Sequence, residues 1–352
     1  MKRSLLLVLC LVSLSLKGQI LDELWKKYNL GDLEYVLEKG LPLIKAHPNN
    51  LDLNLLIGRS FADNNQFKEA IPYLDFVNQN DVNQTWRQAW SLAYLGISYF
   101  GSSNYELSNK CLRESIILNK TENVSKKAKS LMLLFGFDKV YREFETRETE
   151  HLIFHFHPKA VELIKDLEKY INDREIAFGV INQYFIGVVP KKIDFFVWDS
   201  RETMSEVLHT NIGFANPDLC IVHCCYDQTK GHEITHVVSN YIDKIKNKSF
   251  INEGTAVVFD QTDRDRISVA RDAIKVKGLV SLSIKDMWNP KTADLEILYP
   301  VSGAFVEFLI NKEGKEKFFQ LFKNQTYENA KVVYGEAFDS LILEFEQLLF
   351  KS

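Results

Sequence analysis

The feature that most constrains this chain is the run His232-Glu233-Ile234-Thr235-His236, preceded by Gly231. On an α-helix, two histidines four positions apart lie one turn apart on the same face, at the spacing that lets two imidazoles bind one Zn²⁺. Glu233 then lies beside the metal, where its carboxylate can accept a proton from zinc-bound water. The run therefore predicts a helix over about residues 229–244 that faces a metal site.

A candidate third ligand, Glu253, follows seventeen positions after His236, within Asn252-Glu253-Gly254-Thr255-Ala256. Two histidines and one carboxylate leave a fourth zinc position for water, which is the arrangement of a catalytic rather than a structural site. Ordinary packing accounts for any one of His232, Glu233, His236 and Glu253, but not for the set. The sequence predicts one catalytic Zn²⁺.

The segment 231–256 resembles the gluzincin zinc metallopeptidases, especially the peptidase-MA-like proteins related to aminopeptidase N and thermolysin. In these families the two histidines of HExxH are ligands, and a glutamate on the next helix is the third ligand, which matches Glu253. The spacing of sixteen residues between His236 and Glu253 is slightly shorter than in aminopeptidases. The resemblance covers about residues 145–350 and implies a zincin-like fold with a small helical C-terminal subdomain.

The resemblance also implies a second donor to the oxyanion that forms during hydrolysis. Gluzincins of the aminopeptidase kind use a tyrosine downstream of the glutamate ligand, and the segment 298–306 matches that region loosely. Tyr299 is the candidate, with simple packing at a helix entry as the alternative. Asp260 is a weaker candidate for orienting a ligand histidine.

The expected activity is peptide-bond hydrolysis by zinc-bound water, with Glu233 as general base. No Gly-x-Met-Glu-Asn segment of the aminopeptidase N kind precedes residue 232, so an endopeptidase is favoured. One alternative is an exported interaction protein with an inactive or highly specialised peptidase-like domain. A non-peptidase zinc hydrolase is the other.

Strand patterns precede the zinc helix. Residues 151–158, 192–198 and 219–223 alternate or are rich in strand formers, and a helix is predicted over about 159–185. In thermolysin-like peptidases such a sheet packs over the active-site helix, and an edge strand borders the cleft. His155 and His157 share a strand face and are predicted not to bind metal.

Four cysteines, at positions 111, 220, 224 and 225, follow the predicted leader. This number is too small for a disulfide framework in a chain of 352 residues. The cluster of Cys220, Cys224 and Cys225 has no metal-knuckle spacing, and it is predicted to belong to a buried strand.

Residues 19–145 show helical periodicity and predict an all-α domain. Gly58, Phe61, Ala70 and Leu74 have the spacing of a tetratricopeptide (TPR) repeat, in which small residues let paired helices approach closely. Gly96 begins a second such pattern, and an earlier unit ends at residues 48–50. Three degenerate TPR-like repeats are expected, either to bind a peptide or protein partner or simply to pack.

The N-terminus predicts a Sec signal peptide over residues 1–18, because a basic start precedes an apolar run that ends at Gly18. The expected protein is exported, secreted or periplasmic, with no membrane span after cleavage and residues 146–352 as the peptidase-like domain. A net charge of −4 without a basic stripe gives no reason to expect nucleic acid.

Overall fold

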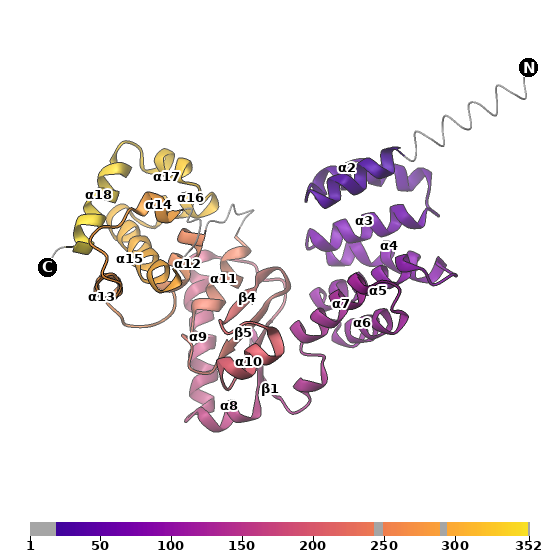
Figure 1. Cartoon of the computed structure of the whole chain (residues 1–352), viewed down its shortest axis with the longest axis horizontal. Coiled ribbons are helices and arrows are strands. Elements are labelled where there is room, and N and C mark those ends of the chain that lie inside the picture. Colours follow the sequence, from indigo (N-terminus) through magenta and orange to yellow (C-terminus); the bar gives the residue numbers. More distant parts are fainter. Residues whose placement is uncertain (1–18, 243–248, 289–293, 351–352) are drawn as a thin grey trace, which may run out of the picture. The chain divides into compact units, whose positions relative to one another are not determined.

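The computed structural model describes residues 19–242, 249–288 and 294–350, so the predicted signal peptide lies outside the described residues. The pattern of contacts divides the chain into two compact units, one up to Arg142 and one from Glu143. Both are drawn in Figure 1. Among the helices that the structure describes, none has the length and hydropathy that a bilayer-spanning segment needs.

The first unit is helical throughout its described part. A helix over residues 19–29 precedes the elements α2 (Leu33–Ala46), α3 (Leu51–Asp63), α4 (Phe67–Asn80), α5 (Trp86–Gly101), α6 (Tyr105–Leu118), α7 (Glu122–Leu134) and the short 3₁₀ helix η1 (Lys139–Tyr141). Most of these helices begin at a residue whose side chain accepts a backbone N–H of the first turn, as Asn50 does for α3 and Thr85 for α5.

The helices of this unit pack in consecutive antiparallel pairs, in which glycines set the closest approach. A Cβ added at Gly58 on α3 would lie 2.6 Å from the side chain of Leu74 on α4. A Cβ added at Gly96 on α5 would lie 2.6 Å from that of Leu112 on α6. The helix pairing expected from the spacing of these residues is therefore present in the fold.

The second unit contains a five-stranded mixed sheet in the order β1-β2-β3-β5-β4. Its strands are β1 (Glu145–Glu148), β2 (Leu152–Phe156), β3 (Ile193–Trp198), β4 (Phe214–Asn216) and β5 (Ile221–Cys225). β2, β3 and β5 are parallel, and β1 and β4 pair antiparallel at the two edges. At this level the structure agrees with helices followed by an α+β region.

The helices of the second unit are α8 (Pro158–Leu163), α9 (Leu167–Phe185), α10 (Arg201–Leu208), α11 (His232–Asn240), α12 (Ser249–Val258), α13 (Arg266–Val276), α14 (Ile284–Trp288), α15 (Leu295–Glu313), α16 (Lys315–Lys323), α17 (Tyr327–Tyr334) and α18 (Ala337–Phe350). One face of the sheet packs on α9 and α11, and this core continues into the helices after α11 (Figure 1). The sheet and α11 therefore share one hydrophobic core.

Three details differ from the sequence-based expectation. The edge strands β1 and β4 were not predicted, because each has only three or four residues. The helix predicted over 159–185 is interrupted, since Asp166 caps a new helix by accepting from the N–H of Lys169. The helix expected over 229–244 is shorter, since α11 begins at His232 and ends at Asn240.

The cysteines are buried as expected, although Cys220 lies just before β5, and each of the other two histidines lies beside a carboxylate. His155 Nε2 lies 3.1 Å from a carboxylate oxygen of Asp194, and His157 Nδ1 lies 3.2 Å from one of Asp199. Neither histidine belongs to a described cluster that could hold a metal. The four cysteines are buried and free, and two of them form the end of β5.

Candidate metal centre

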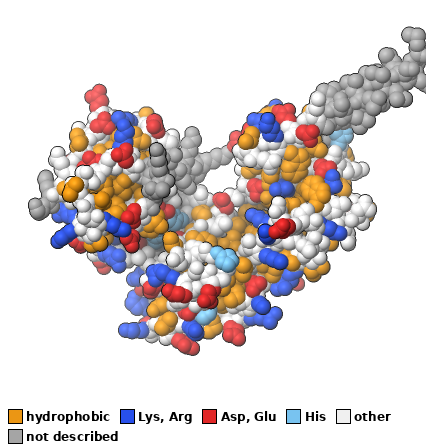
Figure 2. All heavy atoms as spheres, in the orientation of Figure 1, with side chains coloured by type: hydrophobic (Ala, Val, Ile, Leu, Met, Phe, Trp, Pro, Cys, Tyr) orange, Lys and Arg blue, Asp and Glu red, His pale blue; other side chains and the backbone are white. Residues whose placement is uncertain are grey.

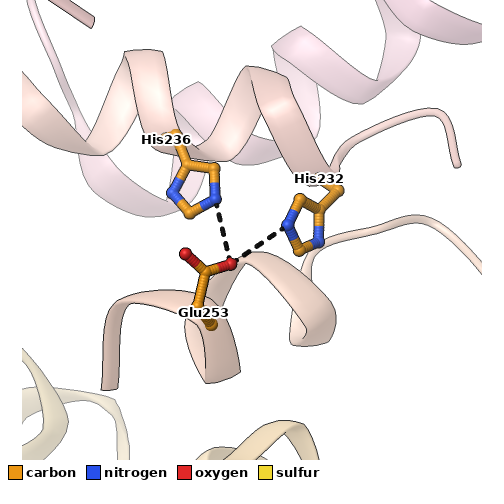
Figure 3. Close-up of side chains that lie close together, drawn as sticks. All are labelled: His232, His236 and Glu253. Carbon is orange, nitrogen blue, oxygen red and sulfur yellow. Dashed lines mark ion pairs between the residues drawn. The ribbon is translucent and has the colours of Figure 1, made fainter. Parts of the chain in front are cut away.

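The structure brings His232, His236 and Glu253 together. The two imidazoles extend from α11 toward the carboxylate on α12 (Figure 3). Glu253 Oε2 lies 3.4 Å from Nε2 of His232 and 3.4 Å from Nε2 of His236. Two atoms about 2.1 Å from one metal, at the tetrahedral angle, are about 3.4 Å apart. The nitrogen and oxygen donors are of the kind that Zn²⁺ prefers, and these two separations match that geometry.

Close helix packing delivers Glu253 to this position. A Cβ at Gly254 would lie 2.5 Å from the backbone oxygen of Ser302 on α15, and one at Gly303 would meet Val257 at 2.3 Å. A Cβ at Gly231, just before α11, would lie 2.1 Å from the backbone oxygen of Phe259. Gly254 and Gly231 thus permit close approaches to neighbouring backbone, and Gly303 leaves room for the side chain of Val257.

Glu233 is buried beside the three candidate ligands and lines the same pocket. Burial raises the pKa of its carboxyl above the ordinary value, although His232 and His236 act in the opposite direction. A carboxylate that binds protons more readily in a partly desolvated pocket is suited to accept one from a reacting water.

The electrostatics of the ligand carboxylate differ from those of Glu233. Burial opposes ionisation of Glu253, but hydrogen bonds from His232 and His236 outweigh it and lower the pKa of Glu253 to about 2. Burial also opposes the charging of His232, yet Glu253 and Glu233 raise its pKa. The pKa values of the two neighbouring glutamates are therefore shifted in opposite directions.

Asn252 is a functional candidate that was not predicted. Its side-chain amide lies 3.2 Å from Nδ1 of His236. Either the nitrogen or the oxygen of an amide can face an imidazole. An amide oxygen there would accept the Nδ1 proton and leave Nε2 free for a metal. The adjacency of Asn252 to Glu253 was visible in the sequence, but its contact with α11 was not.

Asp260 does not have the orienting role considered for it. Its side chain accepts from Arg266 Nη2 at 2.9 Å and from Thr262, and its backbone oxygen accepts from Gly231 N at 3.3 Å. Asp260 therefore ties the segment after α12 to the start of α11, and its charge acts on His232 only at longer range.

Tyr299 lines the same pocket as His232, Glu233, His236 and Glu253. Its ring is 5.8 Å from that of His232 in an edge-to-face arrangement, and burial together with Glu253 and Glu233 raises its pKa to about 12. The phenol is therefore protonated and able to donate a hydrogen bond near neutral pH. Tyr299 comes from α15, across the pocket from α11.

These groups line a pocket of about 380 Å³. β4 and its flanks contribute Gly213, Phe214, Ala215 and Pro217 to the lining. β4 pairs with β5 along one side only and ends the order of the described sheet, so its other side is available to an extended ligand.

The described residues contain one other cluster of this kind, formed by Glu150, His151 and Glu175. Its spacing is different, because His151 Nδ1 lies 2.5 Å from Glu175 Oε1. These two atoms share a hydrogen bond and are too close to flank a metal at about 2.1 Å from each. Glu150 is also largely exposed, so this cluster is best described as a surface ion pair.

No protein-family model matches the sequence, and no curated protein is significantly similar to it. The assignment of function therefore rests on the geometry of the site.

Proposed function

We propose that this chain is an exported zinc peptidase of the gluzincin type, with a zincin-like second unit and a TPR-like first unit. The ligands are His232, His236 and Glu253. The observation that carries the proposal is the pair of 3.4 Å separations between Glu253 and the two histidines, which suit a tetrahedral metal. Zn²⁺, when bound, would lower the pKa of a water and polarise the substrate carbonyl.

The residues of the chain do the rest of the chemistry. Glu233 accepts the proton of the attacking water and delivers it to the leaving amine. Tyr299 donates its phenol proton in a hydrogen bond to the carbonyl oxygen as negative charge develops there. Asn252 holds His236 in the tautomer that presents Nε2. All three groups line the pocket.

Peptide is favoured over other hydrolysable substrates by the position of β4. An extended peptide can hydrogen-bond along the side of β4 that β5 does not occupy, with alternate side chains directed into the pocket. A small ester or amide lacks the backbone groups needed to pair with that strand edge. Internal peptide segments satisfy the pairing on both sides of the cleaved bond, which supports endopeptidase action.

Replacing Glu233 with Gln tests the proposal. The variant is expected to retain zinc and to lose hydrolysis of a peptide library by a factor on the order of 10³ or more, because the amide cannot accept the proton. Glu307→Gln, which alters a partly buried glutamate outside the metal pocket, is the matched control. Unchanged cleavage by Glu233→Gln would exclude Glu233 as the base.

The same experiment separates the alternatives. An exported interaction protein with an inactive second unit would cleave no peptide with either residue at position 233. A zinc hydrolase of another class would cleave small esters or amides in a manner that depends on Glu233, while leaving peptides intact. Profiling the cleaved bonds of the library also reports the sequence preference directly.

A further inference from the structure

β4 is held at both of its ends by residues that flank α11, the helix that carries the two candidate ligand histidines. Before β4, Gly213 packs against the side chain of Gln228, which lies in the turn between β5 and α11. After β4, the backbone oxygen of Pro217 accepts a hydrogen bond from the hydroxyl of Tyr241, the residue that caps the C-terminus of α11. The strand at the edge of the pocket and the helix of the candidate metal centre are therefore connected twice.

The amide group of Gln228 fills the space beside Gly213. A Cβ added at Gly213 would lie 2.5 Å from both the nitrogen and the oxygen of this amide. The amide oxygen accepts the backbone N–H of Cys225 at 2.7 Å, which holds the side chain in place. The backbone of Gln228 is fixed as well, because its oxygen accepts from Nη2 of the buried Arg174 at 3.1 Å. Gln228 therefore connects the segment before β4 to the end of β5 and to α9.

The hydroxyl of Tyr241 holds the segment after β4. Its oxygen lies 2.8 Å from the backbone oxygen of Pro217 and 3.2 Å from that of Asp218, and it donates toward both. Burial raises the pKa of this phenol, so the hydroxyl stays protonated and remains a donor. Because proline has no N–H, a ladder of backbone hydrogen bonds along β4 ends at Pro217.

The pairing of the strands indicates which residue of β4 offers its backbone to a ligand. Successive residues of a strand turn their N–H and C=O groups to opposite sides. Tyr226, directly after β5, donates its N–H to the oxygen of Trp198 on β3 at 2.9 Å, so odd-numbered residues of β5 face the other side, toward β4. One of these, His223, pairs with Phe214, so Phe214 faces β5 and the next residue, Ala215, faces away from it. Ala215 lines the pocket, and its N–H and C=O therefore lie at the edge where a peptide can pair.

The position of Ala215 depends on the contacts at the two ends of β4. The strand has only three residues and pairs with β5 along one side, so its own backbone bonds constrain it weakly. A displacement of about 1 Å between a bound substrate and the reacting groups can cost about 100-fold in rate. The distance between Ala215 and α11 is therefore a quantity that the site has to fix, and Gln228 and Tyr241 join the two elements.

We propose that Gln228 and Tyr241 are positioning residues for the substrate. They hold Ala215 at the distance from α11 at which a peptide paired with Ala215 brings its carbonyl to the metal centre. Both lie outside the set of residues that line the pocket, so they act through Gly213 and Pro217. This inference rests on the proposed peptidase function and adds the residues that determine how the peptide is bound.

The first test measures steady-state kinetics of the full-length, zinc-loaded chain on one peptide that the wild type cleaves. Gln228→Ala and Tyr241→Phe are each expected to raise KM by about 3–10-fold, because a loosened strand pairs less tightly with the peptide. The kcat and the zinc content should stay within about twofold of the wild type, since the metal centre is intact. Gln228→Glu keeps the acceptor for the N–H of Cys225 and should restore the KM of the wild type.

Two matched variants serve as controls. Gln183→Ala removes an exposed glutamine on α9, and Tyr327→Phe removes a hydroxyl from a tyrosine that packs on Trp288. Both should leave KM unchanged. Should Gln228→Ala fail to retain zinc or lose stability in urea, Gln228→Met replaces it, because methionine keeps the length of the side chain and lacks the amide oxygen.

A second test separates positioning from a general loss of structure. Ester analogues of the same peptide each lack one backbone N–H at a bond that is not cleaved. In the wild type, the analogue that lacks the N–H paired with Ala215 should have a KM about 3–10-fold above that of the peptide. In Gln228→Ala and Tyr241→Phe this ratio should approach one, because the same hydrogen bond is already weakened.

The possible outcomes distinguish this inference from the proposed function. If the wild type cleaves the peptide and the folded variants keep its KM, or if the ester ratio is the same in all of them, Gln228 and Tyr241 do not position the substrate. A wild type that cleaves no peptide would overturn the proposed function and this inference with it.

Discussion

Asn252 and Tyr299 contact different histidines of the candidate metal centre. Asn252 touches a ligand, since its amide lies 3.2 Å from Nδ1 of His236. Tyr299 instead packs edge-to-face on the ring of His232 and lines the pocket. Substituting the first should change metal binding, and substituting the second should change turnover.

Asn252→Ala is expected to lower zinc affinity by about 10–100-fold, because His236 loses the group that fixes its ring and tautomer. Asn252→Asp keeps an acceptor at the same place and should retain most of the affinity. Competition with a chromogenic chelator measures both values. Equal affinity of the Ala variant and the wild type would exclude a positioning role for Asn252.

Tyr299→Phe is expected to lower kcat by about 10²–10³-fold with little change in KM or zinc content, since a single oxyanion donor is removed. Tyr327→Phe is the control, because Tyr327 packs on Trp288 outside the pocket. Steady-state kinetics on one cleaved peptide separates the two constants. If zinc content fell and kcat per bound zinc did not, Tyr299 would have only a packing role.

The residues of the site were predictable to different degrees. His232, Glu233 and His236 are one turn of a helix, so their relation follows from spacing alone. Glu253 could be predicted only as the third member of a set of metal ligands, and Tyr299 only from a family resemblance. Asn252 escaped prediction because its partner is sixteen positions away, across the gap between α11 and α12.

Among the elements, the contact between α12 and α15 decides whether the site forms. Glu253 lies on α12 and Tyr299 on α15, and Gly254 and Gly303 bring these helices together. An added Cβ would overlap the backbone of Ser302 at Gly254 and the side chain of Val257 at Gly303. Because the neighbour of Gly254 is the backbone of Ser302, no rotamer change can relieve the overlap.

Gly254→Ala is therefore expected to destabilise the second unit by about 1–3 kcal/mol and to reduce zinc content. Gly179→Ala, on the exposed side of α9 with no atom within 4 Å of the added Cβ, should be neutral or stabilise by up to about 1 kcal/mol. Urea denaturation measures both changes. A stability of Gly254→Ala equal to that of the wild type would mean that the helices can separate without loss.

The missed elements share a physical cause. β4 has three residues, and its strand conformation depends on pairing with β5, which follows it after a short turn. Local propensity carries little information for so short a segment, whereas tertiary pairing determines it. The long helices, in contrast, repeat their apolar spacing over several turns and were predictable, apart from the break before Asp166.

At the scale of the whole molecule, the two units carry different chemistry. The first presents aromatic side chains and a guanidinium, and the second holds the histidines and carboxylates of the metal centre. Acidic and basic side chains are interspersed on the face drawn in Figure 2. The cleavage proposed for the second unit can therefore be tested with variants of that unit alone.

Metal analysis of the purified full-length chain tests the central claim most directly. The account predicts about one zinc per chain in the wild type and in Glu233→Gln, and a large loss in His236→Ala and in Glu253→Ala, because two ligands alone hold zinc weakly. Plasma emission spectroscopy on protein dialysed against metal-free buffer gives these ratios. A zinc-free wild type, or equal zinc in the ligand variants, would contradict the proposed metal centre.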